Sequence, residues 1–261
     1  MSSLPIWPGQ GRVPYVPLPR RDPAYTGKIV VTQEDGIVED LPYGRFVKLL
    51  CEQTTGDERF TVGERIIAPG ASSDRLEADS EAVHVTEGTG TLRVWLDKPP
   101  GRQMDIPLQP GLEVVITEGT RHQWVNDPGA EMLTVVTISH EPFPAYPHHY
   151  PAIFQAGEGN EIHQHDNRVE GFYVVSGPGS MVIANPDNTD VQTVVVPPRA
   201  VGFKPLYVYH RQFNHAPPGG DPCYWIHSMV VFTHRGSRMP QIHVRQHELD
   251  GMTPRWEHPT T

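Results

Sequence analysis

Short apolar runs separated by turn residues recur along most of the chain. The runs are rich in Val, Ile, Thr and Tyr, and few stretches show the sustained apolar period of an amphipathic helix. We therefore predict an all-β protein. The strands expected in the first half lie at residues 28–33, 45–53, 58–70, 81–88, 90–97, 112–119 and 132–140. Those expected in the second half lie at residues 171–177, 179–187, 192–198, 200–210 and 224–234.

The sequence also contains an internal repeat. The stretch EAVHVTEGTGTLRV from Glu81 aligns with EGFYVVSGPGSMVI from Glu170, which lies 89 positions later. The stretch HQWVN from His122 aligns with HRQFN from His210, 88 positions later. Two copies of one β unit are therefore expected.

The repeat and the composition together divide the chain into five parts. A Pro-rich start without periodicity indicates an extended arm, prolines and aromatics between the copies indicate a linker or covering segment, and the end is polar and irregular. The predicted parts are an arm (1–27), an N-terminal domain (28–141), a linker (142–156), a C-terminal domain (157–235) and a tail (236–261).

Composition and charge narrow the possible partners and location. The 261 residues carry a formal net charge of −10, which argues against a nucleic acid or an anionic membrane as partner. No apolar run is long enough to span a membrane, and the N-terminus lacks the apolar core of a signal peptide. The two cysteines form no disulfide framework, so a cytoplasmic location is expected.

Four residues of the second copy form a candidate metal site. His163 and His165 are two positions apart, so in an extended strand both imidazoles face the same side. Glu170 begins the next strand, and His210 follows much later. Three imidazoles and one carboxylate suit Fe(II), Mn(II), Ni(II) or Zn(II). On an octahedral ion this set leaves positions open, which is typical of a catalytic metal.

The spacing of these residues resembles the two motifs of the cupin superfamily. The first motif is matched by Gly157, His163, His165, Glu170 and Gly177, and the second by Gly202, Pro205, His210 and Asn214. Tyr207 stands where the second motif has a glycine. The first copy matches in part, through Glu81, Gly88, Gly111, Gly119, His122 and Asn126. The resemblance covers roughly residues 45–235 and implies a bicupin: two tandem conical β-barrels or jelly rolls, with the metal near a barrel mouth.

The N-terminal copy lacks the histidine pair of the first motif. No histidine lies between Gly70 and Glu81, so only Glu81 and His122 remain as candidate ligands. We expect this half to carry no metal and to serve as scaffold or dimer surface. The alternative is that Asp74 or Glu77 completes a hard site. A homodimer is what the family resemblance implies.

Three further residues are candidates for a role in catalysis. Arg168 lies in the turn between His165 and Glu170 and could pair with a substrate carboxylate or be solvated. Tyr207 could line the pocket, donate a proton or only pack. His227 shares a strand face with Trp225 and Met229, and could be a general base, a substrate contact or a core histidine.

These features support three hypotheses about function. The first is an Fe(II)-type dioxygenase, in which the open metal positions take an enolic, phenolic or hydroxy-acid substrate beside O2; cupins with this ligand set include dioxygenases. The second is a redox-neutral enzyme (isomerase, lyase, cyclase or decarboxylase), in which the metal acts as a Lewis acid. The third is a non-enzymatic bicupin that binds a small ligand. We expect one divalent ion per chain, with Fe(II) favoured over Mn(II), Ni(II) or Zn(II).

Overall fold

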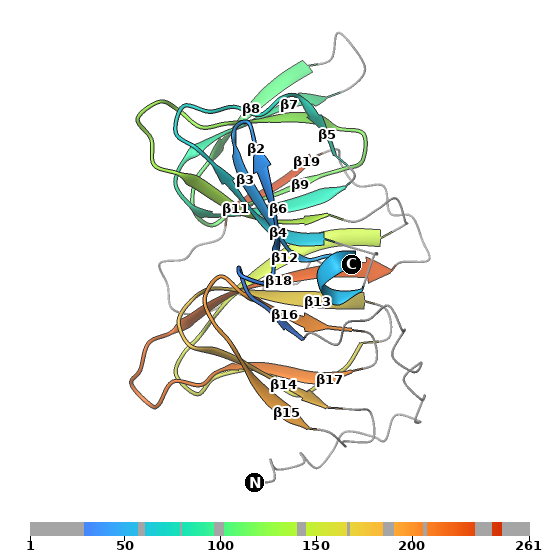
Figure 1. Ribbon diagram of the computed structural model, residues 1–261, viewed down its shortest axis with the longest axis vertical. Coiled ribbons are helices and arrows are strands. Elements are labelled where there is room, and N and C mark those ends of the chain that lie inside the picture. Colours follow the sequence, from blue (N-terminus) through green and yellow to red (C-terminus); the bar gives the residue numbers. More distant parts are fainter. Residues whose placement is uncertain are drawn as a thin grey trace.

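The chain folds into two β-barrels stacked along the long axis of the molecule (Figure 1). The computed structural model describes residues 29–56, 61–78, 80–96, 102–139, 145–165, 168–184, 191–205, 208–232 and 242–246. The described residues form nineteen strands and one helix, so the predicted all-β class is confirmed. No described helix has the length and apolarity needed to cross a bilayer.

The N-terminal barrel consists of a seven-stranded and a four-stranded antiparallel sheet. The larger sheet contains β2 (Ile37–Leu41), β3 (Gly44–Leu50), β4 (Thr61–Ile67), β6 (Glu81–Glu87), β9 (Leu112–Ile116), β11 (Leu133–Ser139) and β19 (Ile242–Gln246). The smaller contains β5 (Leu76–Glu77), β7 (Gly90–Leu96), β8 (Arg102–Leu108) and β10 (Arg121–Val125). Alternate residues from both sheets fill the interior around the fully buried Trp124, because successive side chains of a strand face opposite sides.

The C-terminal barrel has a five-stranded and a three-stranded sheet. The larger sheet contains β1 (Val30–Val31), β12 (Ala145–Phe154), β13 (Arg168–Ser176), β16 (Val201–Lys204) and β18 (Cys223–Phe232). The smaller contains β14 (Gly179–Ala184), β15 (Gln192–Val196) and β17 (Tyr209–Asn214). Phe172, Met181 and Trp225 are buried at the centre of one end of this barrel.

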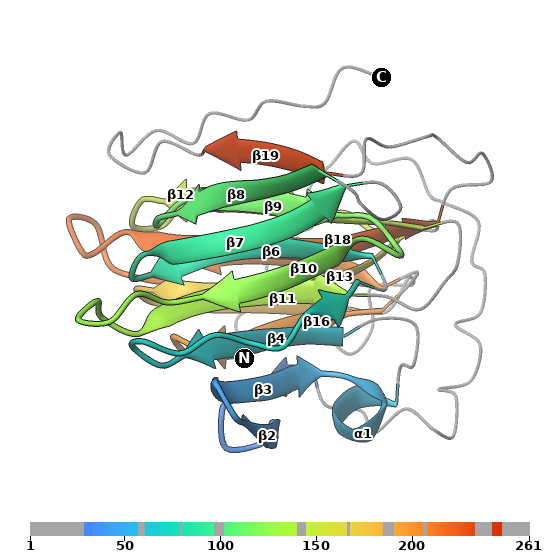
Figure 2. The ribbon, with the colours of Figure 1, turned by 90° about the horizontal axis from the view of Figure 1, so that it is seen from above.

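Each end of the described chain adds a strand to the opposite barrel. β1 pairs with β16 of the C-terminal barrel, although its residues were predicted to begin the N-terminal domain. β19 pairs with β9 of the N-terminal barrel, as Figure 2 shows at one edge of the larger sheet, although it comes from the predicted tail. The two barrels are therefore not made of strictly consecutive residues.

The segment predicted as a linker contains a strand. β12 runs over ten residues and pairs with β18 along its full length. It is the outermost strand of its sheet, so one of its edges has no partner strand. Pro147 and Pro151 are four residues apart, so their nitrogens face the same edge, and this edge tolerates the missing N–H groups.

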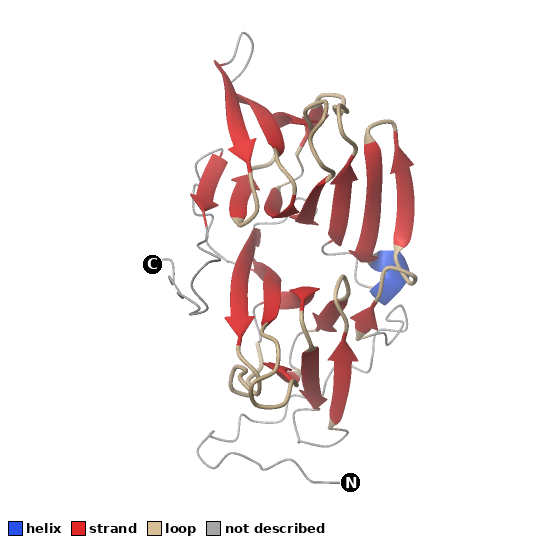
Figure 3. Cartoon of the chain, turned by 90° about the vertical axis from the view of Figure 1, so that its left-hand side faces the viewer, coloured by secondary structure: helices blue, strands red, loops and turns tan. Residues whose placement is uncertain are grey.

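Two of the predicted strands are interrupted in the structure. The strand predicted at 45–53 ends at Leu50, where the four-residue helix α1 (Glu52–Thr55) follows and ends at the left-handed Gly56 (φ 77°); Figure 3 shows the helix where the two barrels meet. The strand predicted at 200–210 is divided into β16 and β17, because Pro205 cannot donate to a ladder.

A shared core and the ion pair of one buried carboxylate hold the barrels together. The shared core contains Leu50 and Ile138 from the N-terminal barrel and Phe203 and Ile226 from the C-terminal barrel. Beside it lies Glu64, which is fully buried on β4.

The Glu64 carboxylate is bound entirely by polar groups of other segments. It accepts a hydrogen bond from the Tyr173 hydroxyl at 2.6 Å and from Gln33 at 3.1 Å, and it pairs with the Arg199 guanidinium. Burial and the neighbouring carboxylate raise the pKa of Tyr173, so its hydroxyl keeps its proton. The carboxylate therefore joins strands of both barrels.

Tyr173→Phe is expected to lower the free energy of unfolding by about 1–3 kcal/mol, because it leaves a buried carboxylate with one donor fewer. Urea denaturation followed by circular dichroism measures this change. The control is Asp105→Asn, which breaks an exposed pair with Arg93 (3.0 Å) and should leave the urea midpoint nearly unchanged. Equal midpoint shifts for the two variants would show that the buried network has no special role.

Candidate metal centre

Backbone pairing brings two of the predicted ligands together across 47 positions of sequence. His163 and His210 form an antiparallel bridge, with N–H to O=C distances of 3.0 and 2.8 Å. Residues opposite each other in such a bridge have side chains on the same face, so their ring centroids lie 4.4 Å apart. His165, two residues after His163, places its ring 4.8 Å from that of His163. Three imidazoles thus gather at one end of the barrel.

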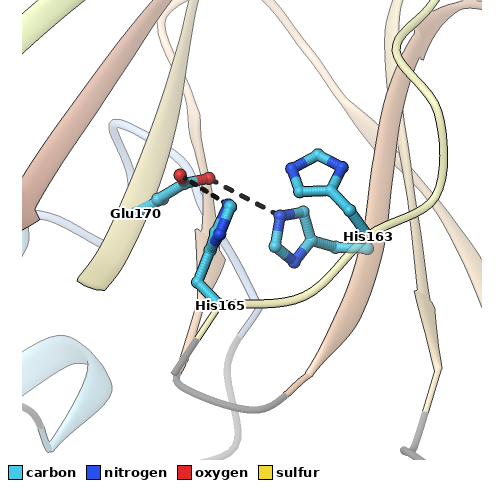
Figure 4. Close-up of side chains that lie close together, drawn as sticks. His163, His165 and Glu170 are labelled. Carbon is cyan, nitrogen blue, oxygen red and sulfur yellow. Dashed lines mark ion pairs between the residues drawn. The ribbon is translucent and has the colours of Figure 1, made fainter. Parts of the chain in front are cut away.

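Glu170 completes the group from the beginning of β13. Its inward-facing carboxylate lies 3.0 Å from Nε2 of His165 and 3.5 Å from Nε2 of His210 (Figure 4). One donor atom from each of His163, His165, Glu170 and His210 lies within 4.8 Å of all the others. That spacing suits a single ion with ligand bonds of about 2.0–2.2 Å.

Hydrogen bonds to the backbone orient two of the rings. Nδ1 of His163 donates to the carbonyl of Glu161 at 2.7 Å, and Nδ1 of His210 donates to the carbonyl of Val208 at 2.8 Å. Each bond fixes the proton on Nδ1 and leaves the Nε2 lone pair free, which is the usual arrangement of a metal-ligating histidine. Nε2 of His210 is buried without a hydrogen-bond partner, as expected for an atom reserved for a metal.

His165 differs because Arg168 contacts its ring. Nη2 of Arg168 donates to Nδ1 of His165 at 3.0 Å, and Nε of the same guanidinium lies 3.1 Å from the Glu170 carboxylate. A neutral ring that accepts a hydrogen bond at Nδ1 carries its proton at Nε2, whereas a ring that ligates through Nε2 carries it at Nδ1. Hydrogen bonding to Arg168 and ligation through Nε2 therefore exclude each other at His165.

A buried lysine is the main feature of the site that the sequence analysis missed. Lys204 is opposite Glu170 in the β13–β16 register, and its ammonium pairs with the Glu170 carboxylate. The ammonium also lies 3.3 Å from the centroid of the Phe172 ring, a cation–π contact. The signal was present as one lysine in the otherwise apolar strand VGFK, all of which is buried.

The charges of the site follow from burial and these contacts. Burial alone would raise the pKa of Glu170, but Lys204 and the neighbouring His165 and His210 more than offset it, so the pKa lies well below its ordinary value. Burial lowers the pKa of Lys204 to about 8 against the attraction of Glu170, so the ammonium stays charged at neutral pH. Burial also lowers the pKa of His210 to about 3, and it lowers that of His163. Both rings are therefore neutral at pH 7, as ligation requires.

The other predicted catalytic candidates are placed as follows. Arg168 is at the site, with its side chain about one third exposed (33%). His227 is buried on β18 in the same barrel, where its Nε2 accepts a hydrogen bond from the Gln212 amide and its ring lies 3.9 Å from that of Phe172. Tyr207 lies outside the described residues.

In the N-terminal barrel a cation lies beside Glu81, the glutamate that aligns with Glu170. Glu81 lies 3.7 Å from Nε2 of His122 and 3.7 Å from the Arg65 guanidinium. Glu77, which was considered as an additional ligand, instead lies 4.0 Å from Arg121 at the surface. Asp74 is exposed. Within the described ranges, only the C-terminal group of four has the close donor atoms of a metal site.

Comparison with known proteins identifies the fold. No protein-family model matches the chain, and no curated protein matches its sequence. The solved structures that match include oxalate decarboxylase from Bacillus subtilis, in a study of its Mn(II) centres (TM-score 0.65, 12% identity, 80% of this chain and 78% of that one). The formate complex of the Lactobacillus farciminis enzyme is similar (TM-score 0.64, 12% identity, 79% and 87%).

The two tandem cupin barrels predicted from the sequence are thus confirmed. At 12% identity, the likeness concerns the fold alone.

His210→Ala should cause loss of the metal. Only three donors remain, and the carboxylate of one of them, Glu170, is also paired with Lys204. Elemental analysis after anaerobic purification and dialysis should find one first-row divalent ion per wild-type chain and less than about a tenth of that in the variant. The matched control is His215→Ala, since the side chain of this exposed histidine of the same barrel bonds Ser180 (2.8 Å). Full metal content in His210→Ala would contradict the four-ligand assignment.

Lowering the pH should destabilise the metal-free protein. The pKa of His210 is lowered from 6.5 to about 3, and that of His227 lies well below 6.5, both chiefly through burial. Below pH 6.5 the unfolded chain therefore binds more protons, and the free energy of unfolding falls toward pH 3.

His227→Gln should reduce that slope by up to about 1.4 kcal/mol per pH unit. Urea titrations at several pH values measure it, with the exposed His215→Gln as the control that keeps the wild-type slope. If His227→Gln left the slope unchanged, His227 would have to take up a proton in the folded protein as it does in the unfolded chain.

Proposed function

We propose that the chain is a metal-dependent enzyme whose C-terminal barrel holds one divalent ion and acts on a small anionic molecule. His163, His165, Glu170 and His210 would hold the ion, with Fe(II) favoured and Mn(II), Ni(II) or Zn(II) as alternatives. The convergence of these four donors within 4.8 Å of one another is the observation that carries the proposal. The N-terminal barrel, with Arg65 beside Glu81, would carry no metal.

The charge of the site supports an anionic substrate. Lys204 compensates the Glu170 carboxylate, so the charge of a divalent ion and that of Arg168 would remain uncompensated by the protein. Arg168 is placed at the partly exposed side of the site, and its planar guanidinium can bind a carboxylate or enolate through two hydrogen bonds. A hydroxy acid, or an enol that carries a second oxygen, has the two oxygens that chelation needs.

The proton chemistry would involve His227 rather than Glu170. The ammonium of Lys204 keeps the Glu170 carboxylate ionised and makes it a weak base. His227 is neutral because burial lowers its pKa, and it lies in the interior of the same barrel beside Phe172. A neutral imidazole can accept a proton at Nε2, the atom that accepts the hydrogen bond from the Gln212 amide in this structure.

The leading reaction class is oxygen-dependent oxidation. A bound Fe(II) would supply electron transfer between an enolic, phenolic or hydroxy-acid substrate and O2, while the protein binds the substrate through Arg168 and keeps Glu170 ionised. The second candidate is a redox-neutral reaction such as decarboxylation. Its support is the fold shared with oxalate decarboxylases. The divalent ion and Arg168 would stabilise an anion formed at the site. A homodimer remains a prediction from the family resemblance.

An oxygen electrode separates the two candidates. Protein loaded anaerobically with Fe(II) or Mn(II) is given catechol, acetylacetone, lactate, oxalate or oxaloacetate, and O2 uptake and CO2 release are recorded. O2 consumed in proportion to substrate supports the dioxygenase, whereas CO2 released without net O2 consumption supports the decarboxylase. His163→Ala should abolish either turnover without unfolding the protein. Turnover that survives this change would exclude the proposed centre.

Arg168→Met should raise KM for a carboxylate substrate about tenfold or more, with little loss of bound metal, because a charged hydrogen-bond pair is removed from the substrate. Steady-state kinetics and elemental analysis measure both quantities. Arg211→Met is the matched control, since Arg211 follows His210 on β17 but alternates to the other face of the strand. An unchanged KM in Arg168→Met would remove Arg168 from the substrate site.

A further inference from the structure

The N-terminal barrel contains a second cluster of polar side chains in its interior. Glu81 opens β6 as Glu170 occupies the start of β13, and His122 lies on β10 as His210 lies on β17. Arg65 from β4 approaches the same carboxylate. Trp124 joins them: its ring is 5.8 Å from the His122 ring, edge to face, and 5.8 Å from the Arg65 guanidinium carbon.

Several polar atoms of this cluster are buried without a hydrogen-bond partner. They are both ring nitrogens of His122, the indole nitrogen of Trp124 and Nε of Arg65. His122 is 2% exposed and Trp124 is completely buried. A buried polar group without a hydrogen-bond partner costs about 1–3 kcal/mol of stability. Three neighbouring side chains that lack such partners therefore indicate that a bound molecule supplies them.

The side chains of the cluster do not satisfy one another with hydrogen bonds. Glu81 is 3.7 Å from both Arg65 and His122, which exceeds a hydrogen-bond distance. Arg65 donates to the Tyr43 hydroxyl at 2.8 Å through Nη1, and its Nε has no partner. The side chains of Arg65 and Glu81 keep 12% and 8% of their surface exposed, so the cluster is not completely closed off.

The charge and the donor pattern define the class of ligand. Arg65 and Glu81 carry opposite charges, and burial lowers the pKa of His122, so the cluster has no net charge at pH 7. It offers N–H donors on Arg65, Trp124 and His122, and acceptors on Glu81 and His122. A cation is disfavoured beside Arg65, and an anion beside Glu81.

We propose that the N-terminal barrel binds a small uncharged hydroxycarbonyl molecule without a metal. Its carbonyl oxygen accepts hydrogen bonds from Arg65 and the Trp124 indole, and its hydroxyl groups donate to Glu81 or His122. This site is separate from the proposed metal centre and does not depend on it.

Nuclear magnetic resonance of the full ¹⁵N-labelled chain tests the proposal with 1,3-dihydroxyacetone as the probe. The indole N–H signal of Trp124 is assigned by its absence in Trp124→Phe. We expect this signal to shift saturably with dihydroxyacetone, and less with acetone, which lacks the hydroxyls, or with glycolate, which carries a charge. Arg65→Met should weaken the binding about tenfold or more, because a charged donor is lost.

The matched control is Arg75→Met, because Arg75 also stacks on a tryptophan of this barrel (4.0 Å from Trp95) but is exposed. It should leave the titration unchanged, as should His163→Ala in the metal centre. A shift that never saturates would mean that only water fills the cluster and would overturn the proposal. So would tighter binding of glycolate or acetone. These comparisons use the wild-type protein, so they remain decisive if Arg65→Met fails to fold.

Discussion

Burial of a glutamate inside each barrel is the constraint that organises the rest of the molecule. An ionised carboxylate in an apolar interior is tolerated only beside a cation and hydrogen-bond donors. In the C-terminal barrel, Lys204 and the histidines supply both to Glu170. In the N-terminal barrel, Arg65 takes that role for Glu81. The repeat thus keeps the glutamate and changes the group that compensates it, which distinguishes the proposed metal site from the proposed site for a neutral molecule.

Sequence alone predicted the parts of the fold and site that depend on local patterns. The spacing of His163, His165 and Glu170 predicted that three donors converge, and the repeat adds His210. The strand expected for the two histidines is only an isolated bridge from His163 to His210. The barrel class followed from a motif resemblance, because apolar runs specify strands but not how sheets close. β8 and β10 were missed, since their sequences, RQMDIPL and RHQWV, mix polar residues with few β-branched ones.

The features that escaped prediction are those set by pairing between distant segments. Lys204 meets Glu170 only through the register of β13 with β16. Arg65 meets Glu81 across strands that β11 separates in the sheet order. The segments predicted as linker and tail contain strands for the same reason. The sequences of β12 and β19 predict a strand only weakly, and these segments are strands because they pair with β18 and β9, respectively.

The exchange of terminal strands couples the two sites. The C-terminal barrel needs β1 from the beginning of the chain and the N-terminal barrel needs β19 from its end, so neither barrel is complete without residues beyond its own consecutive span. The shared core and the Glu64–Arg199 pair add to this dependence. A ligand that binds only folded protein stabilises whatever unfolds with its site. If the barrels unfold as one unit, a ligand bound at the proposed site of the N-terminal barrel would therefore also stabilise the proposed metal centre, although the two sites share no residue.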